Sequence, residues 1–101
     1  MGTETLFTTW IGINDFWDGK GDPVKSVTNI KTGLQKLIDK GGKFFLVFNA
    51  FDITPSPAYG KSTEYHHVIP QVQQMTQTFN SELYKMLFYK IAQYVYDQIL
   101  K

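Results

Sequence analysis

The stretch Leu6-Phe7-Thr8-Thr9-Trp10-Ile11-Gly12-Ile13-Asn14-Asp15 decides the fold class, because a strand-like run ends directly in Gly-x-Asn-Asp. In open α/β sheets, ligands gather just outside the carboxyl ends of parallel strands. A side-chain amide at such a place is positioned to donate a hydrogen bond to a developing negative charge. Asn14 is therefore the leading candidate for a functional residue.

The residues around this motif predict a strand followed by a long loop and a helix. Thr5 to Ile11 reads as the strand, and the glycines and acidic residues of Gly12 to Pro23 favour a loop. Asp22-Pro23 is typical of a helix start, with Pro at the first helical position. Apolar residues then recur at helical spacing, which predicts an amphipathic helix over about residues 24 to 40.

A second strand follows this helix at once. Gly41-Gly42 supplies the left-handed residue at which helices often stop. Phe44 to Phe48 is a continuous apolar run, typical of a parallel strand buried on both faces. A strand, helix, strand unit crosses over in the right-handed sense in nearly all proteins, so both strands end at the same rim of the sheet. Asn14 and Asn49 are then expected to be neighbours there.

The second half of the chain is predicted to be a loop followed by helix. Asn49 to Lys61 contains prolines that disfavour helix, so we expect a surface loop. From Tyr65 onward apolar residues recur at helical spacing, with Pro70 suited to a first turn. Asn80-Ser81 allows a break, since Ser81 is a good helix cap, so this segment is either one helix or two.

Composition narrows the classes of function. The 101 residues suit a single domain, and 43% hydrophobic content is ample for a packed core. All ten basic residues are Lys and the net charge is only +1, which argues against a nucleic-acid or phosphate-binding role. There is no Cys, which excludes thiolate catalysis and Cys-based zinc sites, and no cofactor or metal is expected. No apolar run approaches the roughly 20 residues of a membrane span.

Five features occur in this order along the chain: the strand ending in Gly12-Ile13-Asn14-Asp15, the helix, the Gly41-Gly42 turn, the strand ending at Asn49 and the later Phe79-Asn80-Ser81-Glu82-Leu83. Together they resemble the middle of an SGNH hydrolase, a GDSL-type esterase. The resemblance covers about residues 5 to 101. It implies a flavodoxin-like, three-layer α/β fold with parallel strands, of which residues 1–101 form a single partial domain. It also implies hydrolysis of an ester or acetyl ester through an acyl-enzyme on Ser.

By matching motif positions, the resemblance implies that Asn14 is the oxyanion-hole donor. Gly12 allows a sharp turn and Asp15 supports the loop. Trp10, Phe16 and Trp17 are candidates to line an acyl or sugar pocket, although aromatic residues near strand ends more often belong to the core. The implied ligand is a small-molecule or glycan ester, and a secreted location is suggested by the resemblance alone.

Two blocks of the family are absent from these residues. Neither the Gly-Asp-Ser block with the nucleophile nor the Asp-x-x-His block with the base occurs, so the resemblance is to an interior portion that is expected to be inactive alone. Two strands would also leave both sheet edges unpaired, and such a sheet is marginal without further cover. The alternative is a non-catalytic α/β module that forms a homo-oligomer or swapped dimer, or binds a partner, through its open sheet edge.

Other polar residues have local explanations beside catalytic ones. Asn is also a common turn former or helix cap, which gives Asn14 a local explanation. Asp15 and Asp18 are better explained as residues that cap the loop than as a metal site or an acid/base pair. His66-His67 lacks the i, i+4 spacing of a paired ligand site, which favours a surface or helix-start role. A nucleophile among Ser26, Ser56 and Ser62 that uses one of these His residues is the remaining alternative, because triads are set by space rather than by order.

Overall fold

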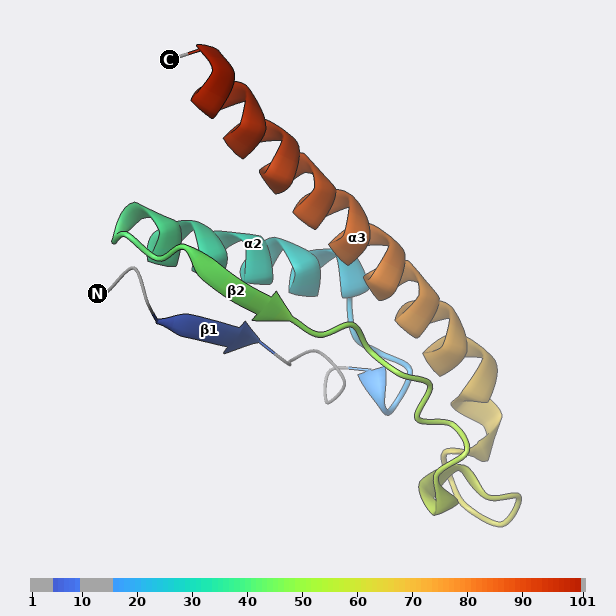
Figure 1. Ribbon diagram of the computed structural model, residues 1–101. Helices are drawn as coiled ribbons and strands as arrows, with labels where there is room; N and C mark the ends of the chain where they lie inside the picture. Colours follow the sequence, from blue (N-terminus) through green and yellow to red (C-terminus); the bar gives the residue numbers. More distant parts are fainter. Residues whose placement is uncertain (1–4, 10–15, 101) are drawn as a thin grey trace.

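The computed structural model describes residues 5–9 and 16–100 and confirms a mixed α/β fold (Figure 1). Two strands, two helices and two short 3-10 turns follow one another along these residues. In chain order they are β1 (Leu6–Thr9), α2 (Pro23–Asp39), β2 (Phe44–Val47), η1 (Pro57–Tyr59), η2 (His66–Val68) and α3 (Ile69–Leu100).

The two strands lie side by side and run in the same direction, as predicted. The register pairs Leu6 with Phe44 at one end and Thr9 with Val47 at the other. The backbone N–H of Phe48 donates to the carbonyl oxygen of Thr9 at 2.9 Å, which carries the pairing one residue past β2. Both strands therefore end at the same rim, where the sequence placed its candidate site.

Local chemistry explains where α2 begins and ends. The carboxylate of Asp22 accepts a hydrogen bond from the backbone N–H of Lys25 at 3.1 Å, and Pro23 occupies the first turn, where its missing N–H costs nothing. At the other end Gly41 has a φ of 95°, a left-handed conformation that L side chains avoid. The helix expected over about residues 24 to 40 is confirmed within one residue at each end.

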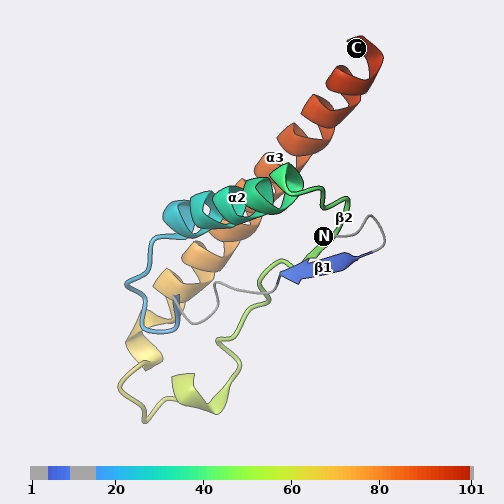
Figure 2. The same ribbon diagram turned by 90° about the vertical axis from the view of Figure 1, so that its left-hand side faces the viewer.

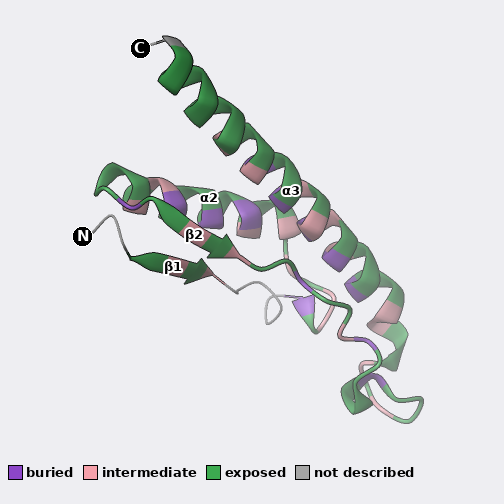
Figure 3. Ribbon diagram, viewed as in Figure 1, coloured by how far each residue is buried: buried purple, intermediate pink, exposed green. Residues whose placement is uncertain are grey.

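Both helices cover the same face of the sheet. The core joins Phe16, side chains of α2 and side chains of α3, and the half-buried Phe45 and Val47 of β2 pack against it. Figure 2 shows both helices on one side of the strands, and Figure 3 shows that their buried positions face inward. The buried members of the two helices are Val27, Ile30 and Leu34 of α2 and Phe79, Leu83 and Met86 of α3.

The prediction that the second strand is buried on both faces is wrong for the described chain. Side chains of β2 alternate between the two faces of the sheet, and Phe44 and Leu46 on the other face are 53% and 46% exposed. The reason is that neither described helix crosses to that side. The continuous apolar run indicates a strand that is suited to burial on both faces, but in the described chain helices cover only one face of the sheet.

The last helix, α3, is continuous from Ile69 to Leu100, so of the two alternatives the single helix is confirmed. Its C-terminal part projects beyond α2, and every side chain from residue 91 to residue 99 is exposed (Figure 3). The radius of gyration is 16.6 Å. A compact chain of this length has a value of about 13 Å. The projecting part of α3 accounts for much of this elongation.

Candidate functional site at the carboxyl ends of the strands

The two parallel strands β1 and β2 end at the same rim of the sheet. Gly12, Asn14, Asp15 and Trp10 lie outside the described residues. The described chain resumes at Phe16, which belongs to the same buried cluster as Ala50 of the segment that follows β2.

Of the three candidate pocket aromatics, Phe16 and Trp17 are described, and they differ in burial. Phe16 is buried in the core and meets the ring of Phe79 edge-on, with 5.4 Å between ring centroids. Trp17 is 42% exposed and meets the ring of Tyr65 edge-on at 4.5 Å. The segment after the Gly-x-Asn-Asp motif is thus anchored by one buried ring and presents the next ring at the surface.

A buried tyrosine ties this segment to the loop that follows β2. The hydroxyl of Tyr59 donates to the carbonyl oxygen of Trp17 at 2.6 Å, across 42 residues of sequence. Ring nitrogen Nδ1 of His66 lies 2.8 Å from the carbonyl oxygen of Tyr59 and must donate, because a carbonyl only accepts. Burial raises the pKa of the Tyr59 hydroxyl, and the nearby Asp18 and Asp52 carboxylates raise it further. The hydroxyl therefore stays neutral and able to donate.

Asn80 fixes the segment that leaves β2. Its side-chain oxygen accepts from the backbone N–H of Ala50 at 2.8 Å, and its side-chain nitrogen donates to the carbonyl oxygen of Ala50 at 2.7 Å. This amide thus completes the backbone hydrogen bonds of a buried residue, as a neighbouring strand would. Sequence reasoning missed this role, because an Asn in a helix carries no signal for a partner 30 residues away.

A polar cluster continues along the same loop. The Asp52 carboxylate accepts from the hydroxyl of Thr54 at 2.7 Å and from its backbone N–H at 3.0 Å, and Gln73 of α3 donates to the Thr54 hydroxyl at 3.2 Å. The hydrogen bond from the Thr54 hydroxyl is the main cause that lowers the pKa of the Asp52 carboxyl, and the backbone N–H adds to it. These bonds hold the loop against the first turns of α3.

Two of the three candidate serines, Ser26 and Ser56, and the candidate Asp18 make hydrogen bonds to nearby backbone. Ser26 Oγ donates to the carbonyl oxygen of Asp22 at 3.1 Å, and Ser56 Oγ accepts from the backbone N–H of Ala58 at 3.3 Å. Asp18 accepts from the backbone N–H of Lys20 at 3.0 Å. These contacts favour turn and cap roles over a nucleophile at Ser26 or Ser56 and over an acid/base role for Asp18.

Within the described ranges, no group of three or more His, Asp or Glu side chains is placed to hold a metal ion. Across the same ranges, no helix is both long and apolar enough to cross a membrane.

The described fold and rim define the chain as an α/β protein with one parallel strand pair covered on one face by two helices. Comparisons with protein-family models, with curated proteins and with solved structures found no match to this chain.

Proposed function

We propose that this chain is an interior portion of an SGNH-type ester hydrolase with a flavodoxin-like fold, in which Asn14 is an oxyanion-hole donor. The observation that carries the proposal is the parallel pairing of β1 with β2, which starts the Gly-x-Asn-Asp segment and the Asn49 segment from the same rim. Polar groups that bind ligands gather at such rims in α/β sheets.

In this proposal a Ser hydroxyl attacks the acyl carbonyl of an ester, and the carbonyl oxygen becomes an oxyanion. The side-chain amide of Asn14 donates a hydrogen bond to that oxygen, and Gly12 lets the backbone turn sharply before it. The nucleophile and the His base belong to segments outside these 101 residues, because neither the Gly-Asp-Ser block nor the Asp-x-x-His block occurs among them. Such an active site needs no metal or cofactor.

Hydrolysis of p-nitrophenyl acetate by the protein with its natural flanking sequence tests this proposal. Asn14→Ala is expected to lower kcat by about 100-fold to 1000-fold with a smaller effect on KM, because the bond to the oxyanion forms mainly in the transition state. Asn29→Ala, at an exposed position of α2, is the matched control and is expected to leave kcat unchanged. Absence of ester hydrolysis in the wild-type protein, or an unchanged kcat in Asn14→Ala, would overturn the proposal.

A second candidate function is favoured by the exposed apolar surface. Leu6, Phe44 and Leu46 lie exposed on the uncovered face of the sheet, and both sheet edges are open in the described chain. Large exposed apolar patches mark interaction sites, and open strand edges accept further strands. In this proposal the chain is a non-catalytic α/β module that completes its sheet with another strand. It predicts no ester hydrolysis above background, and an active chain whose rate collapses in Asn14→Ala would exclude it.

A further inference from the structure

The outer edge of β2 carries backbone groups that point away from β1. The N–H of Phe48 bonds to the carbonyl oxygen of Thr9, so Phe48 directs its peptide groups toward β1. Peptide groups of successive strand residues alternate between the two edges, so Phe45 and Val47 direct theirs to the opposite edge. The described chain has only two strands, in the order β1-β2, and it places no strand beside that edge.

A shallow groove lies between this edge and α3. It has a volume of about 370 Å³. Its lining residues are Val47, Phe48, Asn49, Asn80, Leu83, Tyr84 and Leu87. None of them carries a charge, so the groove suits an uncharged, apolar occupant. Leu83 and Val47 also pack in or against the core, so an occupant here would extend the existing core.

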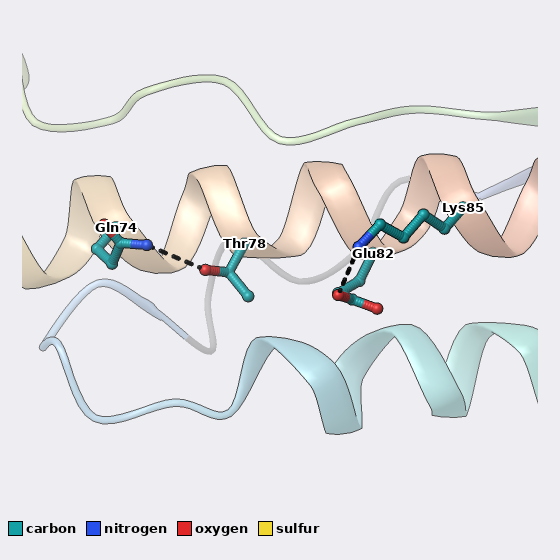
Figure 4. A network of polar contacts seen from close by, with 4 residues as sticks. All are labelled: Gln74, Thr78, Glu82 and Lys85. Atoms are coloured by element: carbon teal, nitrogen blue, oxygen red, sulfur yellow. Dashed lines mark hydrogen bonds and ion pairs between the residues drawn. The ribbon is translucent and has the colours of Figure 1, made fainter.

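The two sides of α3 differ in chemistry. Figure 4 shows a polar row along one side, in which the amide of Gln74 donates to the hydroxyl of Thr78 at 3.3 Å and Lys85 pairs with Glu82 at 3.5 Å. An apolar row runs from the groove along another side, since residues at spacings of three, four, seven and eleven share a helix face. Its members are the half-buried Leu87 and the exposed Tyr84, Phe88, Ile91 and Val95.

We infer that the outer edge of β2 and the apolar row of α3 bind one extended peptide strand, uncharged and apolar at alternate positions, that runs parallel to β2. The direction follows from α3, which runs opposite to β2 as the helix of a strand, helix, strand unit does (Figure 1). The strand adds its peptide groups to those of Phe45 and Val47, and its inward side chains fill the groove, as in strand addition to a sheet edge. This inference rests on the second candidate function and is independent of ester hydrolysis.

A second copy of the whole chain fits this edge less well. Antiparallel pairing of two β2 strands about a two-fold axis keeps the helices of both copies on the same face of the joint sheet. The helices of the second copy would then meet α3, which already projects over that face beside β2 (Figures 1 and 2). A single strand brings no helix with it.

Fluorescence anisotropy with a labelled peptide tests the inference on the chain as it is. The probe has the sequence of residues 44 to 49, Phe-Phe-Leu-Val-Phe-Asn, because this stretch carries no charged side chain and contains β2, which already forms a parallel strand in the structure. Saturable binding is expected. The same peptide with proline in place of its leucine is expected not to bind, because proline removes a backbone donor and disturbs the strand.

A matched pair of tyrosines tests the location. Tyr84 lines the groove and is 76% exposed, whereas Tyr96 lies three helical turns beyond Lys85, on the side of the polar row, and is 63% exposed. Tyr84→Lys is expected to weaken binding of the probe by at least about tenfold, since it brings a charge into an apolar contact. Tyr96→Lys is expected to leave binding unchanged.

Disulfide formation tests the direction. The chain has no Cys, so Asn49→Cys at the end of β2 provides a single thiol. A probe with Cys at its C-terminal end is expected to form a disulfide with it, whereas a probe with Cys at its N-terminal end is not. The inference is overturned by absent binding, by equal effects of the two tyrosine variants, by crosslinking through the N-terminal Cys, or by a stable dimer of the chain that excludes the probe.

Discussion

Both halves of α3 carry large apolar side chains, but the surroundings of these side chains differ. In the first half Val72, Phe79 and Leu83 are fully buried against the core, whereas in the second half Phe88, Ile91 and Tyr94 are exposed. The difference lies in the neighbours: α2, Phe16 and the loop after β2 cover the first half, and contacts with α2 continue only as far as Lys90, which bonds to Gln35. Every side chain from residue 91 to residue 99 is exposed. Apolar periodicity therefore states which residues are suited to burial, while the rest of the fold decides whether a cover exists.

The largest effect is expected when one phenylalanine in each half of α3 is replaced by alanine. Phe79→Ala is expected to lower the free energy of unfolding by about 3 to 5 kcal/mol, because it leaves a cavity in the core. Phe88→Ala is expected to change it by less than about 0.5 kcal/mol, because Phe88 is 68% exposed. Urea denaturation followed by circular dichroism measures both, and equal losses would show that something covers the second half in solution.

Replacement of Asn80 has the next largest expected effect. It tests how the loop after β2 is held against the first half of α3. Asn80→Ala leaves the backbone N–H and carbonyl of buried Ala50 without their partner, which is expected to cost about 1 to 3 kcal/mol of unfolding free energy. The same denaturation experiment applies, with Asn29→Ala at an exposed position of α2 as control. A variant as stable as the control would show that water replaces the Asn80 amide at no cost.

The sequence predicts the parts of the fold that local chemistry controls. Asp22-Pro23 caps α2 and Gly41 ends it, and both act within a few residues of themselves. The parallel strand pair follows from the same reasoning, because a helix between two strands returns the chain to the same end of the sheet.

Contacts between distant residues lie beyond such reasoning. The hydroxyl of Tyr59 reaches Trp17 across 42 residues, and Asn80 reaches Ala50 across 30. Asn80 illustrates the reason: the residue type suggests a local cap, whereas its side chain completes the backbone of another segment. The assignment of Asn14 as an oxyanion donor rests on the sequence motif and on the parallel pairing of β1 with β2, and its role stays a prediction.

Tyr59 offers a smaller effect with a distinct pH dependence. Tyr59→Phe keeps the buried ring and removes the bond to Trp17, which is expected to cost about 0.5 to 1.5 kcal/mol at neutral pH. The pKa of Tyr59 is raised above its usual 10.0, so its neutral form stabilises the fold below pH 10.0, and this contribution is lost as the pH rises through the raised pKa.

Denaturation between pH 8 and pH 12 measures this contribution as the difference between wild type and variant. The wild type is expected to lose its advantage over Tyr59→Phe toward the alkaline end. Tyr94→Phe in the projecting half of α3 is the control, and its difference from wild type is expected to stay flat with pH. If the difference in unfolding free energy between wild type and Tyr59→Phe also stays constant with pH, the hydrogen bond from the Tyr59 hydroxyl does not couple the loop after β2 to the segment that contains Trp17.

Asp52 gives the smallest expected effect, because its carboxylate is exposed although it bonds to Thr54. Those bonds lower its pKa below the usual 3.8, so the ionised form stabilises the fold above pH 3.8, and the contribution is lost as the pH falls through the lowered pKa. Asp52→Asn is therefore expected to be slightly less stable than wild type at pH 6 and equally stable at the acid end of a thermal melt series. Asp97→Asn, in the projecting half of α3, is expected to follow wild type throughout, because no described segment packs against it. If Asp52→Asn also follows wild type at every pH, the first half of α3 is held by its apolar contacts and by Asn80, and the polar cluster on the loop contributes nothing to the contrast between the two halves.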